Sequence, residues 1–206
     1  MEKGVALLSG GIDSPVAIHL LQQRLEIIAA HFHQLPLTDG KEITKVKELC
    51  QVLGVHKLYL IPFTPVLKEL VSKCRHQDYY VLGKIMMMRC AQLIAQKENA
   101  QFLITGENLG QVSSQTLSNL TSITKNVNME ILRPLLTYDK QEIIDVARKL
   151  GTYEISKGPE ICNLLGPKNP ATKSEPARIN HELKNIDMKI LHEELAKAEI
   201  IVFNKK

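Results

Sequence analysis

Apolar residues along the chain follow two patterns: short continuous runs, and stripes that repeat every three to four positions. Short runs bounded by turn residues indicate buried strands, and the longer stripes indicate amphipathic helices. Strands are predicted at residues 5–8, 26–32, 58–61, 102–105 and 130–132, with a short last strand at 200–203. Helices are predicted at residues 15–24, 38–53, 64–73, 78–98, 139–150 and 176–198. This alternation predicts an α/β fold, a Rossmann-like parallel sheet of about five strands flanked by helices.

Capping residues set several of the expected boundaries. We expect Asp139 to cap the helix that follows it, and Ser14 to cap the helix that begins at Pro15. Gly54 and Gly151 are expected to end the helices before them. The polar residues 106–124 predict a loop with a short helix, and residues 158–176 predict a long surface loop.

Composition changes this picture only by excluding other classes. The 206 residues are 44% apolar and 23% charged, which is typical of a globular chain with one sizeable core. No apolar run approaches the roughly 20 residues of a membrane span, and the first residues lack the features of a signal peptide, so we expect a cytoplasmic protein with no membrane partner. The four cysteines include no C-x-x-C pair, which argues against a zinc ribbon or a disulfide scaffold. The net charge of +4 favours polyanions only mildly.

The first candidate for chemistry is the segment SGGIDSP at residues 9–15, between a predicted buried strand and a predicted helix. Paired glycines let the backbone turn sharply and approach a ligand, and a helix start presents free N–H groups to an anion. The segment lacks the ending of a Walker A sequence and the spacing of a dinucleotide-binding loop. It resembles the signature of the PP-loop ATP pyrophosphatases, which release pyrophosphate and form adenylates. The alternative is a tight strand-to-helix turn without a ligand.

An acidic residue in this loop has a further implication. A carboxylate facing phosphates is repulsive unless a cation lies between them, so Asp13 is a candidate ligand of Mg²⁺ and a candidate catalytic residue. ATP and Mg²⁺ are therefore the expected cofactors.

A second segment narrows the resemblance. GENLGQVSSQTL at residues 106–117 is similar to a segment of the tRNA 4-thiouridine synthetases, a family that also acts in thiamine thiazole synthesis. Residues 133–135, 139–144, 151–156 and 159–162 resemble the blocks that follow in that family, so the likeness runs from about residue 5 to residue 203. It implies a PP-loop ATP-binding domain at residues 1–157. At residues 158–206 it implies a family-specific loop bearing Cys162, then a C-terminal helix and strand that pack on the same domain.

The resemblance also implies the ATP contacts. They fall at the ends of strands and in the loops that follow: Leu7, Leu8, Ser9, Gly10, Gly11, Ser14, His31, Phe32, Arg89, Gly106 and Gln115. Backbone groups of Leu8 and Phe32 suit the adenine edge, and the guanidinium of Arg89 suits phosphate. Arg89 lies in an otherwise apolar helical run, where an unpaired charge is costly, so a partner is expected. The alternative is an arginine that reaches solvent at the edge of its helix.

The cysteine at position 162 is implied as the carrier of sulfur. In the family a cysteine at this position receives persulfide sulfur and delivers it to a uridine activated by ATP. Cys162 is the one cysteine expected in a loop, where a thiolate can be reached. Cys50 and Cys90 fall in apolar stripes and are expected to be packing residues, while Cys74 is left unassigned. An inert loop cysteine is the alternative for Cys162.

The implied reaction is adenylation of uridine 8 of tRNA followed by sulfur transfer to give 4-thiouridine. The implied partners are tRNA and a persulfide donor such as a cysteine desulfurase. No THUMP or rhodanese domain is expected in this chain, so tRNA binding would come from a separate RNA-binding partner or from lysines such as Lys157, Lys168 and Lys173. A homodimer stays open. The alternatives are adenylation of another acceptor, either a different tRNA base or a sulfur-carrier protein, and a non-catalytic ATP-binding module.

Overall fold

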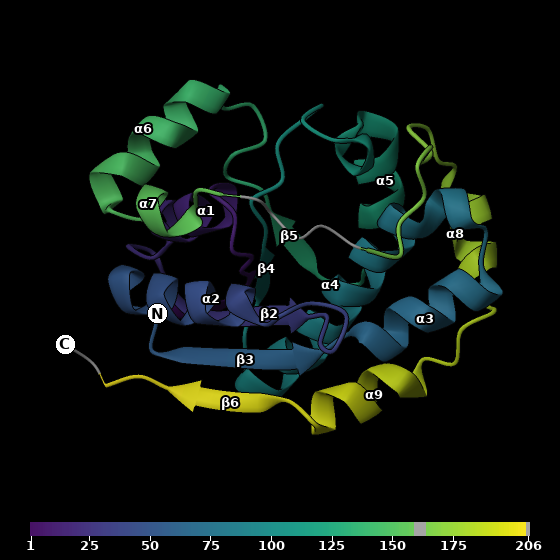
Figure 1. Ribbon diagram of the computed structural model, residues 1–206, viewed down its shortest axis with the longest axis horizontal. Helices are drawn as coiled ribbons and strands as arrows, with labels where there is room; N and C mark the ends of the chain where they lie inside the picture. Colours follow the sequence, from purple (N-terminus) through teal and green to yellow (C-terminus); the bar gives the residue numbers. More distant parts are fainter. Residues whose placement is uncertain (159–163, 205–206) are drawn as a thin grey trace.

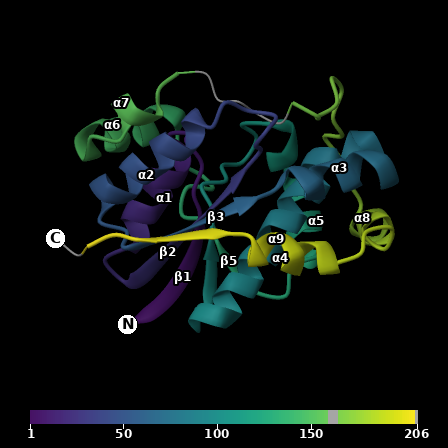
Figure 2. The same ribbon diagram turned by 60° about the horizontal axis from the view of Figure 1, so that its bottom comes forward.

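The computed structural model describes residues 1–158 and 164–204. Within them six strands form one sheet in the order β5-β4-β1-β2-β3-β6. The strands are β1 (Glu2–Leu7), β2 (Leu25–His33), β3 (Lys57–Pro62), β4 (Phe102–Ile104), β5 (Glu130–Leu132) and β6 (Glu199–Val202). The first five are parallel to one another, whereas β6 pairs antiparallel with β3 at one edge (Figure 2). The predicted α/β fold is confirmed, with the antiparallel β6 added to the parallel sheet.

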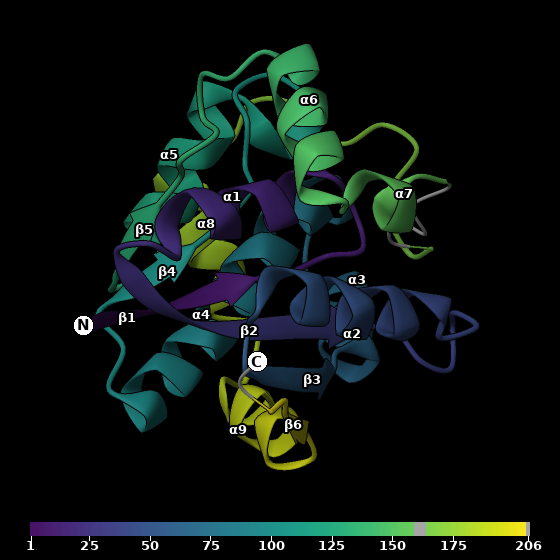
Figure 3. The same cartoon turned by 90° about the vertical axis from the view of Figure 1, so that its left-hand side faces the viewer.

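Helices cover both faces of the sheet (Figure 1). One face carries α1 (Asp13–Leu21), α2 (Lys41–Leu53), α6 (Lys140–Leu150) and α7 (Tyr153–Ser156). The other carries α3 (Thr64–Lys73), α4 (Tyr79–Glu98), α5 (Leu117–Lys125), α8 (Pro176–Leu183) and α9 (Lys189–Ala196). Two short 3₁₀ helices are η1 (His76–Asp78) and η2 (Ser113–Gln115). In Figure 3 the layer of α1, α2, α6 and α7 faces the viewer, and α3 and α8 lie behind it.

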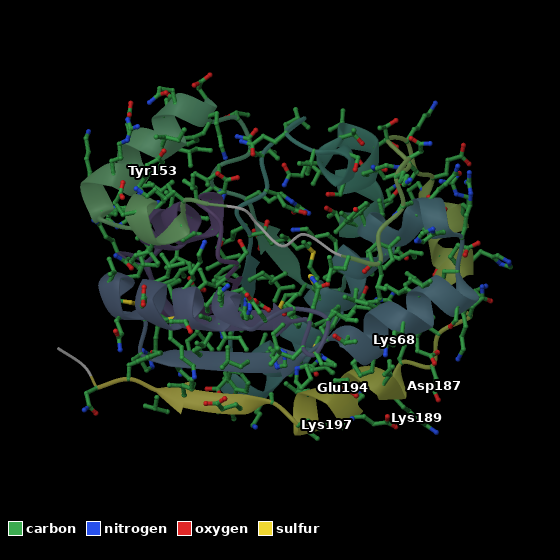
Figure 4. All side chains as sticks on the ribbon, in the orientation of Figure 1. Lys68, Tyr153, Asp187, Lys189, Glu194 and Lys197 are labelled. Carbon is green, nitrogen blue, oxygen red and sulfur yellow. The ribbon has the colours of Figure 1, made fainter. Side chains whose placement is uncertain are left out.

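The strands build two cores because their side chains alternate between faces. Along β1, Val5 packs with α4 and its neighbours, whereas Ala6 packs with α1 and α2. Along β3, Tyr59 belongs to the same core as Val5, and Leu58 belongs to the same core as Ala6. Figure 4 labels residues of both helical layers: Tyr153 lies on α7, whereas Lys189 and Glu194 lie on α9 and Lys197 directly follows it. Within the described residues, no helix is long and apolar enough to cross a membrane.

The predicted helix at residues 176–198 is wrong as a single element. It is divided into α8 and α9 by a turn at residues 184–188. In this turn the side chain of Asp187 accepts a hydrogen bond from the Lys189 amide at 2.9 Å. A carboxylate that binds the backbone two residues further on favours a turn over a continuous helix.

Candidate functional site

The loop after β1 is closed by its own two serine side chains. The Ser9 amide donates to the Ser14 hydroxyl at 2.9 Å, and the Gly11 amide donates to Ser9 Oγ at 3.2 Å. The two hydroxyls are 3.1 Å apart. The turn from strand to helix therefore has a shape that these internal hydrogen bonds fix.

Ser14 does not cap α1, contrary to the sequence-based expectation. The helix begins at Asp13, its N-cap position is Ile12, and no side chain caps it. Ser14 lies one residue inside the helix and turns its hydroxyl back to Ser9. The first turn of α1 thus keeps N–H groups without a side-chain acceptor, which is the arrangement that binds anions.

Gly106 brings a second segment against this loop. A Cβ atom at Gly106 would lie 2.7 Å from the carbonyl carbon of Asp13 and 2.7 Å from the backbone nitrogen of Ser14. Only a residue without a side chain allows the chain after β4 to approach the start of α1 this closely. The segment that begins at Gly106 is therefore one wall of the site.

Asp13 is paired with a lysine from a distant part of the sequence. Its Oδ1 lies 2.7 Å from Nζ of Lys140, the first residue of α6. That helix starts at a capping box between Asp139 and Glu142, which confirms the predicted Asp139 cap. The pair brings one anion and one cation to the mouth of the loop.

The chemistry of the donors around Asp13 can be compared with the needs of Mg²⁺. Within residues 1–158 and 164–204, no group of three or more histidine, cysteine, aspartate or glutamate side chains could hold a metal. Mg²⁺ in nucleotide sites is usually held by one or two carboxylates together with substrate phosphates. Lys140 engages only Oδ1 of Asp13. A single carboxylate that shares the ion with ATP therefore fits these residues, and an all-protein metal cage does not.

Glu107, next to Gly106, is a buried carboxylate that gathers basic side chains. It is 1% exposed, and its Oε2 accepts hydrogen bonds from Arg133 Nε at 2.8 Å and from Thr105 Oγ1 at 3.1 Å. Its Oε1 has no hydrogen-bond partner within the described residues and lies 3.9 Å from Nζ of Lys84 on α4. Electrostatic attraction thus brings Lys84 to the segment that walls the loop.

Lys45 of α2 contributes a third lysine. A Cβ atom at Gly10 would lie 3.5 Å from Cδ of Lys45, so this side chain runs alongside the loop. Its ammonium donates to the carbonyl of Lys157 at 3.3 Å. Lys45, Lys84 and Lys140 were not singled out from the sequence, because a lysine on a helix is ordinarily a solvated surface residue. Their shared neighbourhood appears only in the fold.

His31 is held in one tautomer at the end of β2. Its Nδ1 lies 2.9 Å from the carbonyl oxygen of Leu8, which can only accept, so Nδ1 carries the proton. Burial lowers the pKa of His31 to about 4, and the ring is neutral at physiological pH. Its Nε2 is then an acceptor, and it has no hydrogen-bond partner within the described residues. A buried lone pair of this kind is suited to a donor on a ligand.

Strand register decides which backbone groups remain at this edge. Pairing of β1 with β2 ends at Leu7 and Ala30, whereas β2 continues to His33 alongside β3. The Leu8 amide donates to the Ala30 carbonyl at 2.9 Å, and the Leu8 carbonyl is engaged by His31. Both backbone groups of Leu8 thus have partners inside the protein, and contacts of Leu8 and Phe32 with the adenine edge stay predictions.

Gln115 lies in η2 and contacts its own loop. Its Oε1 is 3.4 Å from the Asn108 amide, and its backbone carbonyl accepts from the Gly110 amide at 2.9 Å. The side chain of Asn108 in turn donates to the carbonyl of Leu135 at 2.8 Å. Gln115 therefore shapes the loop that starts at Gly106.

Arg89 is not brought to the loop at residues 9–14. Its Nε donates to the carbonyl of Asn126 at 2.9 Å, and its NH1 lies 3.5 Å from Sδ of Met188. These partners belong to the helical layer that contains α4, α5 and α9, and α1 lies on the opposite face of the sheet. Arg89 as an ATP contact stays a prediction, with neighbours that do not favour it.

Three of the four cysteines are protonated thiols. Burial raises the pKa of Cys50 and of Cys90 to about 12, and that of Cys74 to about 11. Cys50 and Cys90 are buried in the two cores, and Cys74 is partly buried. None of these three has the thiolate character of a reactive cysteine.

Cys162 lies outside the described residues, but the segments on both sides of it are described. Lys157 precedes it and contacts Lys45 beside the loop. Leu165 follows it, and its carbonyl oxygen lies 2.8 Å from Nε2 of His76 in η1. Since α4 ends just before β4 starts, the other end of α4 and the adjacent η1 lie toward the edge where the strands end. Both flanks therefore lie toward the edge of the sheet at which the strands end, where the loop at residues 9–14 also lies.

Comparisons with known proteins agree on one family. A family model described as thiamine biosynthesis protein (ThiI) matches residues 1–188. A probable tRNA sulfurtransferase of Moorella thermoacetica is 45% identical in an alignment of 191 positions that covers 89% of this chain and 49% of that protein. The chain thus spans about half the length of the curated relatives it matches.

Solved structures show the same relationship. The crystal structure of a 4-thiouridine synthetase in complex with RNA and bound ATP superimposes with a TM-score of 0.93 at 36% identity, covering 98% of this chain and 55% of that one. The NMN synthetase of Francisella tularensis gives a TM-score of 0.61 at 18% identity, covering 93% of this chain and 84% of that one. The second likeness concerns the fold alone.

Proposed function

The chain belongs to the family of the thiamine biosynthesis protein ThiI, and from this premise we propose that it is the ATP-using part of a tRNA sulfurtransferase. The proposed product is 4-thiouridine, made from uridine 8 of tRNA. In this assignment residues 1–157 bind ATP, and residues 158–206 carry Cys162 and complete the same domain. Sulfur supply to thiamine synthesis is a further use that only the family name suggests.

The loop at residues 9–14 is proposed to hold the phosphates of ATP. Three features support this: the uncapped start of α1, the paired glycines and the close approach of Gly106. Lys140, Lys84 and Lys45 stand around the loop and offset phosphate charge. This lysine set is our addition to the contacts that the resemblance implies.

The adenosine part of ATP is proposed to lie along the ends of β1 and β2. The acceptor Nε2 of His31 suits an N–H or O–H donor such as the adenine amino group. Phe32 offers backbone groups beyond the last residue pair of β1 and β2. Leu7 and Leu8 would lie beneath the adenosine, and Gln115 helps to hold the segment that starts at Gly106.

Asp13 is proposed to share a Mg²⁺ ion with the ATP phosphates. When bound, the ion would neutralise phosphate charge and help pyrophosphate to leave. Lys140, which is paired with Asp13, would either leave Asp13 for a phosphate oxygen or contact Asp13 and a phosphate oxygen together.

The proposed reaction has three steps. The O4 atom of uridine attacks the α-phosphorus of ATP, and pyrophosphate leaves. The terminal persulfide sulfur on Cys162 then attacks C4, and AMP leaves with the former O4 atom. A second thiol attacks Sγ of Cys162, which breaks the S–S bond, forms a disulfide and releases the thiolated base.

Partners follow from this scheme. A persulfide donor such as a cysteine desulfurase would load Cys162. An RNA-binding partner, or further RNA-binding residues, would hold the tRNA. The assignment rests most heavily on one observation: the self-closed loop after β1 is walled by Gly106 at backbone contact distance and surrounded by lysines.

ATP–pyrophosphate exchange, measured with and without tRNA, tests the proposal. We expect exchange that depends on tRNA, and 4-thiouridine by mass spectrometry when a persulfide donor is added. Lys140→Gln should slow exchange, whereas Lys149→Gln, at the far end of the same helix, is the matched control. Exchange that ignores tRNA would indicate another acceptor. No exchange under any condition would favour an ATP-binding module without catalysis.

A further inference from the structure

Arg89 lies between two adjoining cavities on the helical layer of α4, α5, α8 and α9. The cavities have volumes of about 370 and 190 Å³, and both are lined by Arg89, Asn126 and Asn128. We call the combined feature the Arg89 groove. Lys125 and the first turn of α8 border the larger cavity, and His192 borders the smaller one.

Hydrogen-bond donors line the groove, and no carboxylate of the described residues borders it. Its ionisable side chains are Arg89, Lys125 and His192, and its other polar side chains are the amides of asparagine and glutamine residues. Lys125, Asn128 and His192 are exposed at its rim. A concave surface of this composition concentrates anions.

The guanidinium of Arg89 is only partly satisfied inside the protein. Its Nε donates to the Asn126 carbonyl, and among the described residues NH1 has only the weak acceptor Sδ of Met188. No carboxylate lies within ion-pair distance of Arg89 in the described part of the chain. Burial lowers the pKa of this half-buried group, which reflects the cost of its charge. A bound anion would offset that cost.

The groove is separate from the loop proposed to bind ATP. Asn126 and Asn128 precede β5, so they lie near the edge where the parallel strands begin. The loop at residues 9–14 follows β1, at the edge where the strands end. The two sites also lie on opposite faces of the sheet, since α4 and α1 belong to different cores.

We propose that the Arg89 groove binds a backbone phosphate of the RNA substrate. The planar fork of Arg89 suits two oxygens of one phosphate, and Lys125 stands at the rim to meet a neighbouring phosphate. Two adjoining cavities with an exposed polar rim suit a chain of phosphates better than a single enclosed ion. The choice of RNA rests on the proposed function.

The test uses the full chain and fluorescently labelled tRNA. Binding is measured by anisotropy over a range of salt concentrations for Arg89→Gln, Lys125→Gln and the matched control Lys149→Gln on the opposite face. We expect Arg89→Gln to weaken tRNA binding roughly tenfold, with a smaller loss for Lys125→Gln. The slope of log K against log salt is negative, and each lost phosphate contact should make it less negative by about 0.7–0.9. The control should match the unchanged protein.

Two further measurements make the result decisive. The dissociation constant for ATP should be the same in the unchanged protein and the three variants. Weaker ATP binding by Arg89→Gln with unchanged tRNA binding would indicate that Arg89 contacts ATP and would overturn the proposal. Because Arg89→Gln can affect folding, Lys125→Gln at an exposed position carries the test independently. Wild-type tRNA affinity and salt slope in both groove variants would also overturn it.

Inorganic phosphate separates the two sources of the anion. If millimolar phosphate shifts the side-chain amide signals of Asn126 and Asn128 in NMR spectra while tRNA affinity ignores both substitutions, the groove binds free phosphate and the proposal fails. Thiolation is scored separately. A chain that never thiolates tRNA but needs Arg89 to bind it refutes the proposed function and supports the groove; the converse result refutes the groove alone.

Discussion

Replacement of Gly106 by alanine tests how the ATP loop is held. The new Cβ would lie 2.7 Å from backbone atoms of Asp13 and Ser14, whereas ordinary contact begins near 3.4 Å. The wall or the start of α1 must therefore shift by the difference, about 0.7 Å. Overpacking of this kind costs about 1–3 kcal/mol, and the lower entropy of the unfolded alanine variant returns about 0.4–1 kcal/mol. We expect a net loss of about 0.5–2 kcal/mol in the free energy of unfolding.

The effect on ATP chemistry should be larger than the effect on stability. A misplacement of about 1 Å in a site that acts by positioning can cost of the order of 100-fold in rate. A shift of similar size at the first turn of α1 would displace N–H groups that are proposed to hold phosphate. ATP–pyrophosphate exchange should therefore fall by at least about tenfold, while the protein stays folded.

Gly83 provides the matched control within the same chain. It lies inside α4, and a Cβ atom there would meet only Cδ2 of Leu67, at an ordinary 3.8 Å. Gly83→Ala should stabilise the protein by about 0.5–1 kcal/mol, because alanine favours a helix, and should leave ATP affinity unchanged. Urea unfolding and ATP titration measure both variants. Wild-type exchange in Gly106→Ala would show that the close approach does not shape a nucleotide site, and the reasoning would be refuted.

Three further predictions concern single side chains. Asp13→Asn should leave urea unfolding almost unchanged but abolish pyrophosphate exchange, because it removes the proposed shared ligand; normal exchange would contradict that role. The lowered pKa of His31 means that the unfolded state binds its proton more readily, so stability is full above about pH 6.5 and falls by about 3 kcal/mol as the pH drops to about 4. His31→Asn, whose amide can still donate to Leu8, should flatten this part of the pH profile of unfolding; an unchanged profile would exclude the histidine as its source. Cys162→Ser should keep ATP binding and adenylation but lose sulfur transfer, and thiolated tRNA at the normal rate would show that sulfur arrives another way.

Periodicity located most elements but could not detect the break in the last helical region. Ile179, Leu183 and Ile186 are buried, Ile190 packs against the same core, and the four residues are three or four positions apart across the turn. The burial pattern therefore continues through the turn, although the helical backbone is interrupted there. The local hydrogen bond from the Lys189 amide to Asp187 stabilises the turn just before α9 starts, and a hydrophobic pattern does not reveal it.

Strand existence was easier to predict than strand direction. The run at residues 200–203 was expected as a strand, and β6 occupies residues 199–202. Nothing in a four-residue run indicates which neighbour it joins or in which direction. Figure 2 shows α9 in line with β6, and from the end of α9 the chain runs along β3 in the direction opposite to that strand.

The basic residues of α4 show why a site is harder to predict than a fold. Lys84 and Arg89 are five positions apart, so they are rotated by about 140° around the helix and cannot both face one ligand. The sequence indicated that Arg89 needs a partner, and the resemblance implied that this partner is ATP. The structure draws Lys84 toward Glu107 beside Gly106 and Arg89 toward Asn126. The direction in which each side chain points depends on packing, which one sequence does not display.

The cysteines limit how the thiolated base can be released. Sulfur transfer from a persulfide on Cys162 leaves an S–S bond that a thiolate must break. The pKa values of Cys50 and Cys90, about 12, and of Cys74, about 11, leave almost no thiolate at neutral pH. Burial of Cys50 and Cys90 in opposite cores also keeps them from any substrate at the sheet edge. The resolving thiol of the proposed reaction is therefore none of these three, and a reductant, a partner protein or a part of the protein outside this sequence would supply it.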